Sequence, residues 1–229
     1  MQGAAMRRRR FEGVMFDLDG TLVQTDFEIA DAVNDTLAAQ GLPAVAQQQV
    51  VRWIGQGTRE LLVQALASAQ QVSVAAVHAS DDLPARVAEF DHHYARRCGT
   101  NSQLYPQVRE VLTELQAQGV RLALVTNKEA RFTHQVLQAH ALTAHFEQVV
   151  SGDTLPTKKP DPAGIALCLA AWQLPAQRTL FVGDSSIDVA TARRAGVPVW
   201  ALPYGYNMGQ PIADCGPDRV IDTLAALLA

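Results

Sequence analysis

Cysteine is scarce in this sequence, and the few cysteines present stand far apart. There are 3 among 229 residues, Cys98, Cys168 and Cys215, and no two of them form a Cys-x-x-Cys pair. A thiolate zinc site needs such close spacing, so the sequence argues against one. An odd number of scattered cysteines fits reduced thiols, and we therefore expect a cytoplasmic protein.

The sequence also has no excess of positive charge and no long hydrophobic run. Its formal net charge is -4, whereas proteins that bind nucleic acids present basic faces, so we expect no nucleic-acid partner. No apolar run approaches the roughly 20 residues that span a bilayer, so we expect no membrane partner. The one basic run, residues 7–10, resembles the start of a signal peptide, but the segment FEGVMFDLDG after it carries three acids. We interpret this run as a solvated tail.

Short apolar runs alternate with helical patterns over most of the chain. A length of 229 residues suits one domain that carries an insertion, and we expect a monomer or a homodimer. The apolar runs predict strands at residues 13–18, 121–126, 146–150, 178–184 and 197–202, with a last strand near 218–221. The patterns between them predict helices at residues 106–118, 129–140, 162–172 and 187–195, and a helix at the C-terminus. We therefore predict an α/β fold with a Rossmann-like, doubly wound parallel sheet.

One long stretch interrupts this alternation after the first strand. It shows helical patterns and no convincing strand, so we predict an inserted helical cap. Thr25 and Glu28 have the spacing of a capping box, which predicts a helix that begins there and ends at Gly41. The predicted domains are an α/β core at 1–24 and 101–229 and a cap at 25–100, joined by hinges near 23–25 and 99–104.

Polar side chains follow four of the predicted strands. Ligands of doubly wound sheets bind beyond the carboxyl ends of the strands, so these side chains should lie together. They are Asp17, Asp19, Thr126, Asn127, Lys159, Asp184 and Asp188. Four crowded carboxylates repel one another unless a cation lies among them, and oxygen-only ligands at this density favour Mg²⁺.

The order of these motifs resembles that of the haloacid dehalogenase-like hydrolase superfamily. The motifs are Asp-x-Asp-Gly-Thr at 17–21, a strand-terminal threonine at 126, Lys-Pro at 159–160 and Gly-Asp-Ser-x-x-Asp at 183–188. The resemblance covers the whole predicted core, and the position of the cap agrees with it. It implies a Mg²⁺-dependent phosphatase that forms a phosphoaspartate and acts on a small phosphorylated metabolite.

The resemblance also implies a catalytic role for each matching residue. Asp17 would attack phosphorus, and Asp19 would protonate the leaving oxygen and later deprotonate water. Thr126 would contact the transferring phosphoryl group with Asn127 beside it, and Lys159 would balance the charge of Asp17 and the phosphate. Physical chemistry agrees, because a carboxylate that approaches a phosphate dianion needs its charge offset. A covalent intermediate also divides the hydrolysis into two easier steps.

The same resemblance implies a metal site. Asp17, the main-chain carbonyl of Asp19 and Asp184 would bind Mg²⁺, and Asp188 would support the site directly or through water. The motifs need neither Lys128 nor Lys158, so we interpret both lysines as surface charges.

Several other activities stay open at this point. A dehalogenase does not use the second motif acid, so Asp19 argues against that activity. Related sugar phosphomutases tend to have Val-Ile after the motif glycine, where this chain has Thr21 and Leu22. Phosphatases of sugar phosphates, nucleotides or pyrophosphate share fold and motifs. An inactive binding protein would lack a motif acid, whereas every motif acid is present here.

Two further stretches resemble phosphoglycolate phosphatases within this superfamily. They are RWIGQGTRELLVQAL at 52–66 and LPYGYNMG at 202–209, and they imply 2-phosphoglycolate as the substrate. In the first stretch Gly55, Gly57 and Thr58 precede a predicted helix, whose free N–H groups suit a small anion. We predict that they bind the substrate carboxylate, with Arg59 adding charge. The alternative is that they only end one helix and begin the next, without a ligand.

Overall fold

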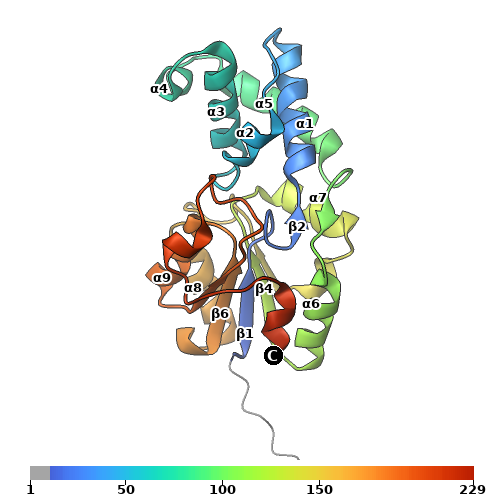
Figure 1. Cartoon of the computed structure of the whole chain (residues 1–229), viewed down its shortest axis with the longest axis vertical. Helices are drawn as coiled ribbons and strands as arrows, with labels where there is room; N and C mark the ends of the chain where they lie inside the picture. The colour runs from blue at the N-terminus through green and yellow to red at the C-terminus, as the bar shows by residue number, and fades with distance from the viewer. Residues whose placement is uncertain (1–10) are drawn as a thin grey trace, which may run out of the picture.

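The computed structural model describes residues 11–229, and a six-stranded parallel sheet forms its centre (Figure 1). The basic run at 7–10 lies outside the described residues. The strand order is β5-β4-β1-β6-β7-β8, and the strands are β1 (Gly13–Phe16), β4 (Arg121–Val125), β5 (Gln148–Val150), β6 (Thr179–Gly183), β7 (Val199–Ala201) and β8 (Arg219–Val220). The predicted α/β fold with a parallel sheet is therefore confirmed. Each predicted strand is present, but each is shorter by one or two residues at one end or at both ends.

Side chains of alternate residues in the central strands pack into two separate hydrophobic cores, one on each face of the sheet. Val14 and Phe16 of β1 belong to one core, whereas Met15 between them belongs to the other. Helices α6 (Val108–Ala117) and α7 (Ala130–Ala139) contribute to the first core, and α8 (Ala163–Trp172) and α9 (Ser186–Ala195) to the second. Both faces of the sheet are therefore covered, which explains why its strands read as continuous apolar runs.

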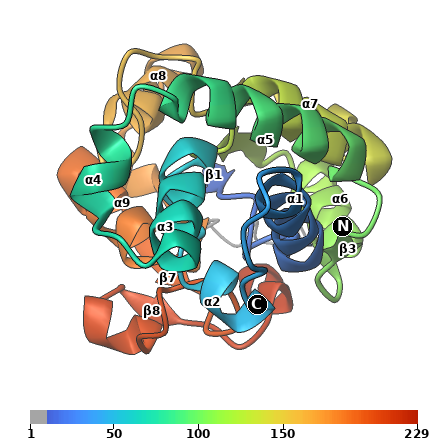
Figure 2. The same ribbon diagram turned by 90° about the horizontal axis from the view of Figure 1, so that it is seen from above.

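Five helices lie beyond the carboxyl ends of the strands and form the cap (Figure 1). They are α1 (Asp26–Ala39), α2 (Gln47–Val51), α3 (Thr58–Gln70), α4 (Val74–His78) and α5 (Leu83–Arg97). Seen from above, β1 is visible between α3 and α1, and α5 runs alongside them (Figure 2). A short antiparallel ribbon of β2 (Val23–Gln24) and β3 (Gln103–Leu104) carries both connections between core and cap. The predicted helical cap is present, and its exact limits stay a prediction. No helix within 11–229 is long and apolar enough to cross a membrane.

Two local predictions are wrong. Thr25 precedes α1, but its side chain does not cap the helix, and it donates instead to Asp19 Oδ1 at 2.8 Å. Glu28 accepts the main-chain N–H of Gly99 at 2.8 Å, so it ties α1 to the second connection rather than to its own N-terminus. The expected C-terminal helix is a short 3₁₀ turn at Leu224–Leu228. In the predicted capping box, contacts with residues outside the helix therefore replace the expected contacts of Thr25 and Glu28.

Candidate active site

The strand order brings the motif residues to one edge of the sheet. Strand β1 lies between β4 and β6, and Phe16 is in register with Leu124 and Val182. The residues that follow one or two positions after these three therefore lie close together at the carboxyl edge of the sheet. In this way Asp17, Thr126 and Asp184 meet beyond the carboxyl ends, as the sequence predicts.

Three buried carboxylates stand together at this edge. Asp17, Asp184 and Asp188 each offer an oxygen within 4.8 Å of the other two, and they form the one such group of potential ligands found among residues 11–229. Burial raises the pKa of Asp17 to about 6, although Lys159 opposes the shift. Burial, with Asp188 and Asp17 nearby, also holds the pKa of Asp184 well above its usual range. Such a crowded set of oxygen ligands fits a hard divalent cation such as Mg²⁺.

Lys159 supplies positive charge directly beside Asp17. Its Nζ lies 2.9 Å from Asp17 Oδ1 and 2.7 Å from Asp188 Oδ1, and its side chain is buried. Burial opposes the charged form, but the two carboxylates outweigh this effect and raise the pKa of Lys159. The ammonium group therefore stays charged next to Asp17.

Asp188 is held by contacts within the protein. Its Oδ2 accepts the main-chain N–H groups of Asp184 at 3.1 Å and of Ser185 at 3.0 Å, and the Ser185 hydroxyl at 2.7 Å. Its Oδ1 accepts from Lys159. Asp188 thus positions Lys159 and the start of α9, and its predicted contact with a metal stays a prediction.

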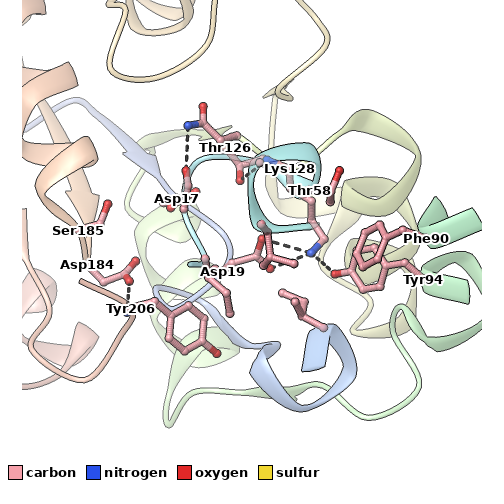
Figure 3. A pocket seen from close by; sticks show the side chains of 16 residues that line it. Asp17, Asp19, Thr58, Phe90, Tyr94, Thr126, Lys128, Asp184, Ser185 and Tyr206 are labelled. Atoms are coloured by element: carbon pink, nitrogen blue, oxygen red, sulfur yellow. Dashed lines mark hydrogen bonds and ion pairs between the residues drawn. The ribbon is translucent and has the colours of Figure 1, made fainter. Parts of the chain in front are cut away.

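Lys128 is buried, which contradicts its interpretation as a surface charge (Figure 3). Its Nζ lies 3.0 Å from Asp19 Oδ1 and 3.2 Å from Asp19 Oδ2, and it also donates to the hydroxyl of Tyr94 in α5. The paired charges and the cap helix above explain why a lysine can be buried here. In the sequence, its position two residues after Thr126, at the end of a central strand, was the feature that indicated a place at the site. Lys158 is exposed, as expected.

The two residues after β4 face a cavity between core and cap. Thr126 Oγ1 accepts the main-chain N–H of Lys128 at 3.3 Å, which leaves its hydroxyl hydrogen free to donate to a ligand. Asn127 Nδ2 donates to the main-chain oxygens of Gly55 and Lys159, each at 2.9 Å. Asn127 therefore connects the cap to the core.

The predicted carboxylate-binding segment is only partly at the cavity. Gly55, Gly57 and Thr58 line it, whereas Arg59 is exposed and does not. The Thr58 hydroxyl donates to Glu129 Oε1 at 2.7 Å. The start of α3 thus faces a carboxylate of the protein itself, and its role in substrate binding stays a prediction.

Comparison with known proteins adds to this geometry. A model of the haloacid dehalogenase-like hydrolase family matches residues 14–202, which include the four motifs at 17–21, 126, 159–160 and 183–188. The chain belongs to this family. A phosphoglycolate phosphatase of Vibrio parahaemolyticus is 38% identical over 97% of both chains, and one of Yersinia pestis is 41% identical over 96% of this chain and 93% of its own. The predicted family is confirmed, and with it the prediction of a phosphatase.

Solved structures agree with this assignment. The crystal structure of a predicted phosphoglycolate phosphatase from Haemophilus somnus is 34% identical, with a TM-score of 0.90, and covers 96% of this chain and 98% of its own. The structure of CbbY from Rhodobacter sphaeroides in complex with phosphate has a TM-score of 0.77 over 95% of this chain and 96% of its own. At 24% identity this second likeness supports the fold alone.

Proposed function

We propose that this chain hydrolyses 2-phosphoglycolate to glycolate and phosphate through a phosphoaspartate on Asp17. The observation that carries the chemistry is the position of Asp17, which lines the cavity 2.9 Å from the ammonium of Lys159. A nucleophilic carboxylate needs this offset of charge when it approaches a phosphate dianion.

In the first step a carboxylate oxygen of Asp17 forms a bond to phosphorus, and the bond from phosphorus to the glycolate oxygen breaks. Asp19 gives a proton to that leaving oxygen. In the second step Asp19 takes a proton from water, the water oxygen bonds to phosphorus, and the bond between Asp17 and phosphorus breaks. Acid and base assistance of this kind contributes about 10²–10⁴ in rate. Thr126, with its free hydroxyl hydrogen, would donate to the phosphoryl group.

Magnesium fits the buried acids at this edge. Asp17, Asp184 and the main-chain carbonyl of Asp19 would hold it, and Asp188 would keep Asp184 and Lys159 in place. When bound, the ion neutralises part of the negative charge that Asp17 and the phosphoryl group bring together. The raised pKa values of Asp17 and Asp184 support a cation here, because burial of these charges alone is unfavourable.

The choice of substrate rests on the relatives and on the two stretches at 52–66 and 202–209. Both stretches lie near the site, since Gly55, Gly57 and Thr58 line the cavity together with Tyr206. Closure of the cap over a small substrate would exclude water until the second step. A cytoplasmic location and a monomeric or homodimeric state remain proposals, which cell fractionation and light scattering would test.

The test is kcat/KM for a panel of phosphate compounds. It comprises 2-phosphoglycolate, glucose 1-phosphate, glucose 6-phosphate, pyrophosphate, a nucleoside monophosphate and acetyl phosphate. A site that binds the carboxylate should prefer 2-phosphoglycolate by at least about 10-fold. Preference for another compound by that margin contradicts the substrate but leaves the phosphatase chemistry intact.

A further inference from the structure

Lys128 is a buried cation that the proposed hydrolysis does not use. Its side chain is 2% exposed and comes from the loop after β4, next to the proposed phosphoryl site. Burial opposes its charge, but Asp19 above all, with Cys98 and Glu28, outweighs this effect and raises the pKa of Lys128. The protein therefore holds a charged ammonium group beside its cavity.

Lys128 is also distinctive among the side chains that line the cavity. Of the lining residues within 11–229, Lys128 alone carries a positive charge. The cap side of the cavity is largely apolar, with Ile54, Leu61 and Phe90. Among the described side chains that line the cavity, Lys128 is therefore the one cation that an anionic group at the far end of a substrate can contact.

The contacts of Lys128 hold its ammonium group in place. An ammonium group has three N–H donors, and here it contacts both carboxylate oxygens of Asp19 and the hydroxyl of Tyr94, so a substrate carboxylate would replace one of the two contacts with Asp19 (Figure 3). The Tyr94 ring also lies against it, with Nζ 4.9 Å from the ring centroid. Asp19 has a second partner in Thr25, so it stays in place when Lys128 gains a ligand.

We propose that Lys128 binds the carboxylate of the substrate and that Tyr94 holds its ammonium group for this purpose. The inference rests on the proposed substrate. In 2-phosphoglycolate three bonds separate phosphorus from the carboxylate carbon, so the receptor must lie next to the phosphoryl site. Lys128 meets this requirement because it stands two residues after Thr126 and contacts Asp19.

The start of α3 is a poorer receptor for the same carboxylate. The Thr58 hydroxyl has one hydrogen, which it donates to Glu129, and it carries no positive charge to attract a carboxylate. Arg59 is exposed, and a solvated arginine contributes little to binding. Both features favour Lys128.

The test compares 2-phosphoglycolate with ethyl phosphate, which has a methyl group in place of the carboxylate. In Lys128→Met, kcat/KM for 2-phosphoglycolate should fall about 10- to 100-fold more than kcat/KM for ethyl phosphate, because one charged hydrogen bond is lost. Loss of the contact with Asp19 lowers kcat/KM for both substrates, so this effect cancels in the ratio of the two kcat/KM values. The matched control is Arg96→Met, which removes an exposed cation that lies outside the cavity on the same helix as Tyr94, and it should keep the wild-type ratio.

The outcomes separate the inference from the proposed function. If the wild type does not prefer 2-phosphoglycolate to ethyl phosphate, the proposed substrate and the inference both fail. If the wild type prefers it and Lys128→Met keeps that preference, the inference alone is wrong. A selective loss in Arg59→Met without one in Lys128→Met also overturns it. Should Lys128→Met fail to fold, Tyr94→Phe keeps the charge and should show a smaller loss in the same direction, whereas an unchanged ratio overturns the inference.

Discussion

The hydroxyl group of Tyr206 caps helix α1 at Asp26. It accepts the main-chain N–H of Asp26 at 3.1 Å and donates to Asp26 Oδ1 at 3.1 Å, and it also accepts the N–H of Thr25 at 2.9 Å. The main-chain N–H of Tyr206 donates to Asp184. One residue of the loop after β7 therefore connects the proposed metal site to the first cap helix.

We expect Tyr206→Phe to destabilise the protein. The change leaves two helix N–H groups and a carboxylate oxygen without this partner in a buried place, which should lower the free energy of unfolding by about 1–3 kcal/mol. Urea denaturation measures this loss. Tyr204→Phe is the matched control, because the Tyr204 hydroxyl donates one hydrogen bond, to the main-chain oxygen of Thr21 at 3.1 Å. A loss in Tyr206→Phe no larger than in this control would contradict the capping role.

Asp17→Asn should stabilise the metal-free protein at neutral pH. Burial raises the pKa of Asp17 from 3.8 to about 6 in the folded state, so the folded protein binds this proton more tightly than the unfolded chain does. Stability from this group is therefore highest below about pH 4 and falls as pH rises through about 6. Because the amide carries no charge, we expect a gain of up to about 3 kcal/mol at pH 8.

The same gain should shrink towards zero near pH 4, where wild-type Asp17 is protonated and has the shape of asparagine. Urea denaturation in EDTA at both pH values provides the measurement. A variant less stable than the wild type at pH 8 would show that the charged carboxylate of Asp17 does not destabilise the folded protein.

Activity should depend on the metal site. We expect EDTA to abolish turnover and Mg²⁺ to restore it, whereas Ca²⁺ should inhibit because it prefers a larger and looser shell of oxygen ligands. Asp184→Ala should raise the Mg²⁺ concentration needed for half-maximal activity sharply. The exposed Asp222→Ala serves as a control and should not change it. Full activity in the presence of EDTA would contradict a metal-dependent reaction.

Asp19→Ala should slow both chemical steps, but not equally for every substrate. A good leaving group needs no proton, so p-nitrophenyl phosphate should still transfer its phosphoryl group at an appreciable rate. Water attack still needs a base, so a burst of nitrophenolate should precede slow turnover, with kcat reduced about 10²- to 10⁴-fold. Rapid-mixing absorbance follows both phases. Normal steady-state turnover in this variant would exclude Asp19 as the acid and base.

The parallel sheet and the motif residues could be predicted because each depends on short, local patterns. Buried strands such as Arg121–Val125 read as apolar runs, and the residue that follows such a strand must lie at the carboxyl edge. Because the strand order places these strand ends next to one another, the cluster of motif residues could be predicted without knowing any side-chain contact.

Most of the wrong predictions depend on contacts between residues far apart in the chain, although Thr25 and Asp19 are six residues apart. Thr25 and Glu28 have the right spacing for a capping box, yet Asp19 and Gly99 compete successfully for their side chains. Lys128 is buried because Tyr94, from a cap helix 34 residues earlier, covers it. Tyr206 caps a helix 180 residues away. Local spacing carries no signal for such partners, whereas the position of Lys128 two residues after a motif threonine could have been recognised.

The most direct test of the central claim is the location of the phosphoryl group on the enzyme. Asp19→Ala mixed with p-nitrophenyl phosphate and Mg²⁺, quenched in acid during the burst, should contain a phosphorylated peptide. Fragmentation in the mass spectrometer should place the phosphoryl group on Asp17, and the double variant with Asp17→Asn should carry none. A phosphoryl group on another residue, or a burst without any labelled protein, would contradict a phosphoaspartate at Asp17.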